Sequence, residues 1–272
     1  MLFFIVLWYN FYKRRVSMNK KKYYAMNKPY YTRKRWNLLF KLVALIARLF
    51  FVKKHELRFQ EEIDFSTPSI YIGNHATTAT PSAIHLYFPG KKRPWVVGDM
   101  CSLKTIPKYA KEEFWTNYKP KWLFQKVLPV LVAPIGYMIM RGAEAIPVYR
   151  DGRMIVTIKK TVQSLEDGVN VYIFPEYDQP YSEYHNDFED GFVNVASVYY
   201  RKTKKKLKFY PLYNCFDKRI MSFGVPIEFN PDNSLEEERK RITTYLKENV
   251  TKLAREIGPH KVISYRYKGN KR

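Results

Sequence analysis

The imidazole of His75 is the side chain whose position most suggests chemistry. It follows a short apolar run at residues 69–72, which predicts a buried strand that ends before Asn74. After it, Thr80 and Pro81 predict the start of a helix, with Thr80 as the N-cap and Pro81 in the first helical position. Open α/β sheets place their chemistry at strand ends of this kind. A histidine held there can act as a general base near neutral pH.

Two further predicted strand ends carry residues of notable chemistry. Arg150 follows an apolar run at residues 145–149, and the tripeptide Phe174-Pro175-Glu176 closes the run at 169–174. With His75, these residues supply a base, a guanidinium and a carboxylate at three strand ends.

The order and spacing of these residues resemble the glycerolipid acyltransferase family, whose best-known member is 1-acylglycerol-3-phosphate acyltransferase. That family reads Asn-His followed by four residues and an Asp, then a strand ending in Arg, then Phe-Pro-Glu-Gly-Thr-Arg, then a Pro on a later strand. The matching positions here are Asn74-His75 with Thr80, residues 142–150 with Arg150, Phe174-Pro175-Glu176, Gly191-Phe192 with Ala196, and Pro211. The resemblance covers residues 65–213.

The resemblance implies a role for each matching residue. His75 would take a proton from an acceptor hydroxyl as that oxygen attacks an acyl thioester. Asn74 would orient the loop or contact substrate. Arg150, with Phe174, Pro175 and Glu176, would hold the acceptor's phosphate, a task that suits a bidentate guanidinium. Glu176 could as readily bond backbone at the turn instead of substrate. The donor would be acyl-CoA or acyl-carrier protein, with no bound cofactor and no metal.

Two departures from the family pattern bear on these roles. Thr80 stands where the family has Asp, and a neutral hydroxyl cannot offset a positive imidazolium as a carboxylate does. We expect Asp99, after the next predicted strand, to replace that carboxylate, with Asp178 as the other candidate. Tyr177-Asp178-Gln179 replaces Gly-Thr-Arg, which weakens the case for a glycerol-phosphate acceptor. Three residues could compensate for the lost arginine: Arg141, Arg153 and His185.

The elements that position these residues alternate between strands and helices. Strands are expected at residues 69–72, 94–97, 145–149, 169–174 and 208–213, with a strand or hairpin at 219–229. Helices are expected at residues 154–165, 188–200 and 235–257, the last opened by a capping box at Ser234. The apolar stretch at 122–140 is interrupted by prolines and fits a lipid-contacting wall or the core. This alternation, with the resemblance, predicts an α/β fold with a central mixed sheet flanked by helices.

The first 58 residues are expected to form a basic, apolar, membrane-associating arm before an acyltransferase-like domain at 59–272. The arm holds 15 Lys/Arg and one acid, so it contributes +14 of the net +23. Residues 36–52 predict an amphipathic helix with Lys41 and Arg48 on one face, lying in the membrane surface. An ordinary buried helix is the alternative. Residues 1–12 are too short to span a bilayer, which takes about 20 residues. They would be an interfacial anchor, or precede a true start at Met18.

The resemblance, with the basic and apolar arm, implies a membrane-associated acyltransferase of phospholipid biosynthesis at the cytoplasmic membrane face, peripheral or monotopic. Its partners would be anionic membrane lipids and the acyl donor. Cys101 and Cys215 lack metal-ligand spacing, as in a reduced protein. One alternative is a catalytically impaired protein of the same fold that binds lipid or an acyl carrier. A third is a nucleic-acid-binding protein that uses the basic and aromatic residues at 13–54. No nucleic-acid partner is expected, because residues 36–52 are too apolar for that role.

Overall fold

The computed structural model describes residues 34–76, 79–114 and 122–263, and the predictions for residues 1–33 lie outside these ranges. A central sheet has the strand order β1-β9-β8-β2-β5-β3-β4, with β10 beside β8. Its strands are β1 (Glu56–Phe59), β2 (Ile70–Gly73), β3 (Lys92–Val97), β4 (Ile146–Val148), β5 (Asn170–Ile173), β8 (Lys208–Cys215), β9 (Ile220–Phe223) and β10 (Ile227–Glu228). A separate antiparallel ribbon pairs β6 (Glu176–Pro180) with β7 (Asn186–Phe188).

The strand directions confirm the prediction of a mixed sheet. Strands β8, β2, β5, β3 and β4 run parallel, so their carboxyl ends share one edge. Strands β9 and β10 run antiparallel to β8, and β1 runs parallel to β9. The predicted boundary at residue 58 falls within β1, so the last residues of the predicted arm belong to the sheet.

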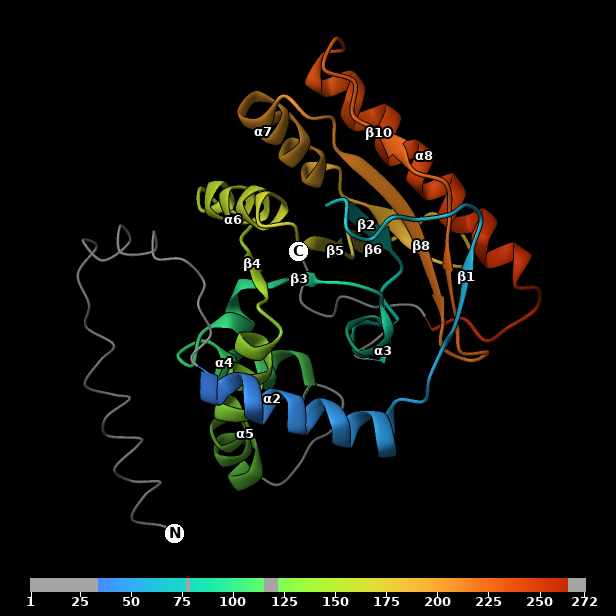
Figure 1. Ribbon diagram of the computed structural model, residues 1–272. Helices are drawn as coiled ribbons and strands as arrows, with labels where there is room; N and C mark the ends of the chain where they lie inside the picture. The colour runs from blue at the N-terminus through green and yellow to red at the C-terminus, as the bar shows by residue number, and fades with distance from the viewer. Residues whose placement is uncertain (1–33, 77–78, 115–121, 264–272) are drawn as a thin grey trace.

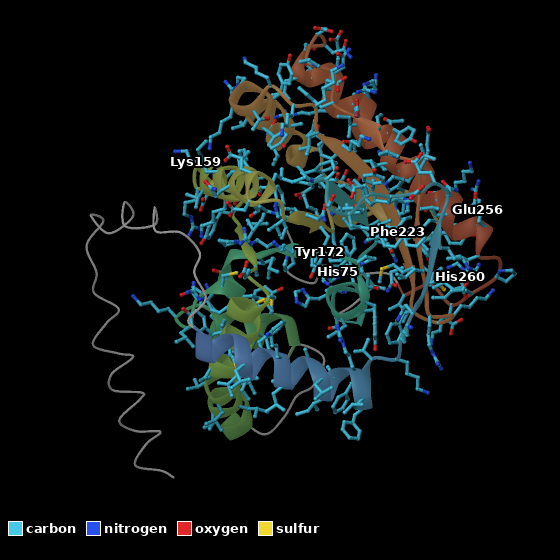
Figure 2. All side chains as sticks on the ribbon, viewed as in Figure 1. His75, Lys159, Tyr172, Phe223, Glu256 and His260 are labelled. Atoms are coloured by element: carbon cyan, nitrogen blue, oxygen red, sulfur yellow. The ribbon has the colours of Figure 1, made fainter. Side chains whose placement is uncertain are left out.

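Helices cover both faces of the sheet (Figure 1). The helical segments are α2 (Lys34–Ile46), the π-helical turn η2 (Ala47–Phe51), α3 (Ala79–Tyr87), η3 (Gly98–Cys101), α4 (Ile106–Phe114), α5 (Trp122–Gly142), α6 (Met154–Glu166), η4 (Gly191–Val193), α7 (Asn194–Thr203) and α8 (Leu235–Glu256). All four residues of β2 are buried, and successive side chains point to opposite faces of the sheet. Ile70 and Ile72 pack with α6, α7 and α8, whereas Tyr71 packs with α3. Tyr172 and Phe223 belong to the α3 side of the core (Figure 2).

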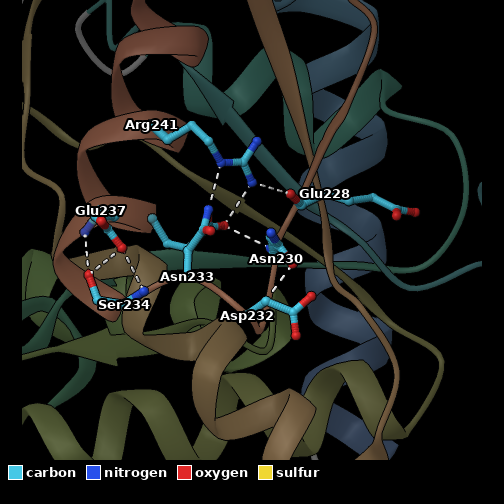
Figure 3. A network of polar contacts seen from close by, with 8 residues as sticks. Glu228, Asn230, Asp232, Asn233, Ser234, Glu237 and Arg241 are labelled. Carbon is cyan, nitrogen blue, oxygen red and sulfur yellow. Dashed lines mark hydrogen bonds and ion pairs between the residues drawn. The ribbon is translucent and has the colours of Figure 1, made fainter.

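The amino end of α8 confirms the predicted capping box (Figure 3). The Ser234 hydroxyl accepts from the Glu237 backbone N–H at 3.2 Å, and the Ser234 N–H donates to the Glu237 carboxylate at 2.8 Å. One residue later, the buried Glu238 carboxylate pairs with Arg241 and accepts from the Asn230 N–H. These contacts fix α8 to the loop that follows β10.

Three expected elements differ from the structure. Helix α3 begins at Ala79, so the N-cap prediction for Thr80 is wrong, and the Thr80 N–H already donates to the Ala76 carbonyl. The helix expected at 188–200 starts at Asn194, because the preceding residues pair in β7 and turn in η4. The stretch at 122–140 forms one helix with Pro129 and Pro134 inside it. Packing of α5 against α2 and α4 offsets the hydrogen bonds that those prolines remove.

The helix expected at 36–52 is confirmed as α2 with η2, and it crosses α5 (Figure 1). A Cβ on Gly142 of α5 would meet the Phe40 ring at 2.3 Å, so the glycine permits the close crossing. The Arg48 guanidinium donates to the Leu86 carbonyl at 2.6 Å and thereby satisfies the carboxyl end of α3. Among the described residues, no helix is long and apolar enough to cross a membrane.

Candidate active site

His75 lies directly after β2, at the edge where the parallel strands end. A Cβ on Gly73 would stand 2.7 Å from the Leu212 carbonyl oxygen, so a glycine is needed where β2 approaches β8. The His75 ring meets the Phe174 ring edge-to-face at a centroid distance of 5.1 Å. Burial lowers the pKa of His75 to about 4. The imidazole is therefore neutral at pH 7 and able to accept a proton.

Glu176 connects the His75 loop to the β6–β7 ribbon. One carboxylate oxygen accepts the His75 backbone N–H at 2.9 Å, and the other accepts the Asn186 N–H at 3.2 Å. The side chain is 5% exposed, and this burial raises its pKa to about 7 although the two hydrogen bonds oppose the shift. Glu176 thus bonds backbone at the turn, as one of its two predicted readings has it. Pro175 belongs to the same turn, since its carbonyl accepts the Glu189 N–H at 2.8 Å.

Glu176→Gln is expected to remove a pH-dependent part of the stability. A pKa of about 7 in the folded protein exceeds the ordinary value of 4.5, so the folded state holds an extra proton between those values. The free energy of unfolding falls as the pH rises through that window and levels off above it. The full fall is on the order of 3 kcal/mol.

Denaturant titrations of the wild type and Glu176→Gln from pH 4 to 8 measure this effect. Subtracting the two curves removes the contributions of His55, His75, His85 and His185, whose lowered pKa values act in the opposite direction. A difference that is constant across the range would contradict the raised pKa.

Two asparagines and Thr80 form a buried network beside His75. The Asn74 amide donates to the Asn214 carbonyl at 3.2 Å, and the Asn214 N–H donates to the Asn74 side-chain oxygen at 2.8 Å. The Asn214 amide in turn donates to the Thr80 hydroxyl at 3.3 Å. Asn74 therefore locks the end of β2 to the end of β8, which is the loop-orienting role expected of it. Asn214 was not among the site residues predicted from the sequence. Its signal would have been a polar residue within an otherwise apolar strand.

Arg150 is linked to the β6–β7 ribbon by an ion pair with Glu189. The strand order places β4 three positions from β2, which is about 14 Å across the sheet. The guanidinium of Arg150 contacts the Glu189 carboxylate at 2.9 Å, and Glu189 is the residue bonded to Pro175. The structure thus links the three predicted strand ends through Pro175, Glu176 and Glu189.

The other candidate residues are more dispersed. Asp99 is exposed in η3 and lies close enough to Tyr149 to help raise the pKa of that phenol. Burial and a backbone hydrogen bond are the causes that shift the pKa of His75, so Asp99 as its carboxylate partner stays a prediction. Arg153 pairs with Asp151 at 2.6 Å. His185 turns toward α8, where it contacts the Thr251 hydroxyl at 3.0 Å.

A groove of about 1010 Å³ is lined by the ribbon and α8. Residues of β6, β7 and η4 line it together with the first turns of α8, and Tyr177 and Glu189 are among the lining residues. Glu189 therefore lines the groove and also pairs with Arg150.

Comparisons with known proteins add little to this picture. No protein-family model and no curated protein sequence matches the chain significantly. Among solved structures, the crystal structure of the 1-acyl-sn-glycerophosphate (LPA) acyltransferase PlsC from Thermotoga maritima matches with a TM-score of 0.41 and 13% identity. The match covers 93% of this chain and 91% of that one. A likeness at this level carries no argument about function, so the α/β class rests on the strand order and packing described above.

Proposed function

We propose that this protein is an acyltransferase that moves a fatty acyl group from acyl-CoA or acyl-carrier protein to a hydroxyl of a lysophospholipid or related acceptor. The observation that carries the proposal is the His75 loop. A neutral imidazole stands at the sheet edge, and its backbone N–H is held by Glu176 of the third motif. Pro175 and Arg150 also belong to the matching motifs, and both contact Glu189. The Pro175 carbonyl accepts the Glu189 N–H, and the Arg150 guanidinium pairs with the Glu189 carboxylate.

In this mechanism His75 takes the proton of the acceptor hydroxyl as that oxygen attacks the thioester carbonyl. The tetrahedral intermediate then collapses, the C–S bond breaks, and the imidazolium returns its proton to the departing thiolate. An imidazole with a pKa of about 4 is a weak base, so a carboxylate near it would have to stabilise the imidazolium. We propose Asp99 for this role. The acyl donor is a co-substrate, and the mechanism uses no resident cofactor.

A second candidate is a non-catalytic protein of the same fold that binds lipid or an acyl carrier. Its specific support is the neutral network beside His75, because Thr80 and Asn214 occupy the region where the family pattern has a carboxylate. Without an acid near His75, the lipid site would bind without turnover.

Acyl transfer from labelled acyl-CoA and from labelled acyl-carrier protein into a membrane-lipid extract separates the two candidates. Transfer above that of heat-inactivated protein supports the acyltransferase, and the labelled product identifies the acceptor. Vesicle binding without transfer from either donor supports the non-catalytic protein.

We also propose that α2, η2 and α5 hold the protein peripherally at the cytoplasmic face of a membrane. These helices present large apolar side chains to solvent: Leu38, Leu39, Leu42, Leu45, Ile46, Leu49, Phe50, Phe51, Leu128, Leu131 and Ile135. Lys41, Lys53 and Lys54 are exposed beside them. A basic residue near an anionic surface contributes about 1 kcal/mol to binding. Apolar faces of this extent mark interaction surfaces.

The paired substitution Leu49→Glu and Phe50→Glu is expected to weaken binding to anionic vesicles by tenfold or more. These side chains are 66% and 75% exposed, so the folded protein loses little when they change. Burying each in lipid stabilises the bound state by about 1.5–3 kcal/mol. Vesicle sedimentation measures the change. The control is Ile155→Glu on α6, at a residue 51% exposed, compared with the single variant Phe50→Glu, which makes the same change in net charge; the Ile155 variant should bind as the wild type does. Equal losses in both variants would contradict the proposed face.

A further inference from the structure

The guanidinium of Arg150 already pairs with a carboxylate of the protein itself, that of Glu189. Its terminal nitrogen lies 2.9 Å from a Glu189 carboxylate oxygen, and the two side chains are 52% and 49% exposed. The backbone of Glu189 is fixed, because its N–H donates to the Pro175 carbonyl at 2.8 Å. An acceptor phosphate that binds Arg150 therefore competes with the Glu189 carboxylate for the guanidinium or lies next to it.

The surroundings of this pair are rich in carboxylates. The Tyr177 hydroxyl donates to Asp187 at 2.8 Å, and this hydrogen bond raises the pKa of Tyr177, with burial and the charges of Asp187, Glu189 and Asp190 adding to the shift. Lys247 pairs with Asp187 at 2.8 Å, so this cation is also neutralised from within. Three carboxylates thus lie around Tyr177, at the start of the segment that departs from the Gly-Thr-Arg pattern.

These contacts disfavour a headgroup that carries only negative charge. A phosphate monoester paired with Arg150 would face the Glu189 carboxylate, with Asp190 next in the chain, and like charges repel. A headgroup with both a phosphate and an ammonium group avoids this cost. Its phosphate can pair with Arg150 while its ammonium pairs with Glu189, so both side chains keep a partner of opposite charge.

We propose that the acceptor headgroup is zwitterionic, with phosphate at Arg150 and ammonium at Glu189, so that Glu189 determines headgroup specificity. This inference rests on the proposed acyl transfer for its biological meaning. The headgroup preference itself can be measured without turnover.

The experiment uses two water-soluble headgroup probes, glycerol 3-phosphate and glycerophosphoethanolamine, with the full chain at low ionic strength. Low salt is required because a half-exposed pair is screened as salt rises. Titration calorimetry should give about tenfold tighter binding of glycerophosphoethanolamine to the wild type. Glu189→Gln should remove this preference by strengthening glycerol 3-phosphate binding and weakening the zwitterion. Glu183→Gln, an exposed acid in the turn of the same ribbon, makes the same change in net charge and should keep the preference.

Three results would overturn the inference: equal or tighter binding of glycerol 3-phosphate to the wild type, the same preference in both glutamine variants, or no binding of either probe. Acyl transfer to the matching lysolipids is then compared. A Glu189-dependent binding preference without transfer would refute the proposed function and leave the headgroup inference standing. Equal transfer to lysolipids with either headgroup would support the proposed function and refute the headgroup inference.

Discussion

Replacing His75 with alanine is expected to lower acyl transfer by at least about 100-fold, the effect of losing a general base. His75 places a basic imidazole just after β2. Its loop is fixed by the hydrogen bond from the His75 backbone N–H to the Glu176 carboxylate. The backbone hydrogen bond survives the substitution, so the loop should keep its position. Initial rates with labelled donor measure the effect on kcat and KM separately.

His260→Ala is a suitable control for that loss. His260 contacts the Tyr213 hydroxyl at 2.8 Å, and it lies well apart from His75 in the view of Figure 2. Its replacement should leave transfer close to that of the wild type. Retained thermal unfolding and vesicle binding would show that His75→Ala is folded. A folded His75→Ala protein with undiminished transfer would refute the assigned mechanism.

Phe223→Ala is expected to lower the free energy of unfolding by about 3–5 kcal/mol, the usual cost of removing a buried phenyl ring. Phe223 is fully buried on the α3 side of the sheet, where its ring lies 5.8 Å from Phe65 and 5.7 Å from Phe88. Deleting it leaves a cavity between β9 and α3 that the surrounding rings cannot fill. Denaturant unfolding followed by tryptophan fluorescence and circular dichroism measures the change.

Phe59 provides a matched control on the neighbouring strand. Its ring stacks on Phe223 at 5.0 Å, yet it is 44% exposed, so Phe59→Ala removes less buried area. We expect less than half of the Phe223 effect. Equal losses at the two positions would contradict the burial assigned to Phe223.

Local pattern was enough to predict most of the sheet and its helices. The apolar run before Asn74, the strand before Arg150 and the Ser234 capping box all appear where they were expected. These features depend on neighbours a few residues apart, through strand alternation, helix period and cap chemistry. Thr80 shows the limit of that reasoning, since a good capping residue became the second residue of α3.

The sequence by itself also determined which strand ends carry the imidazole, the guanidinium and the carboxylate. Only the tertiary structure decided what those groups touch. The Glu176 carboxylate accepts the backbone N–H groups of His75 and Asn186. The Thr80 hydroxyl accepts from the Asn214 side chain, which lies 134 positions later in the sequence. The Arg150 guanidinium pairs with the Glu189 carboxylate. Apart from the Glu176–Asn186 contact within the ribbon, these contacts join segments far apart in the chain, and strand order and register set them. Neither is encoded by the spacing of neighbouring residues, which is why the site's residue types could be read and its partners could not.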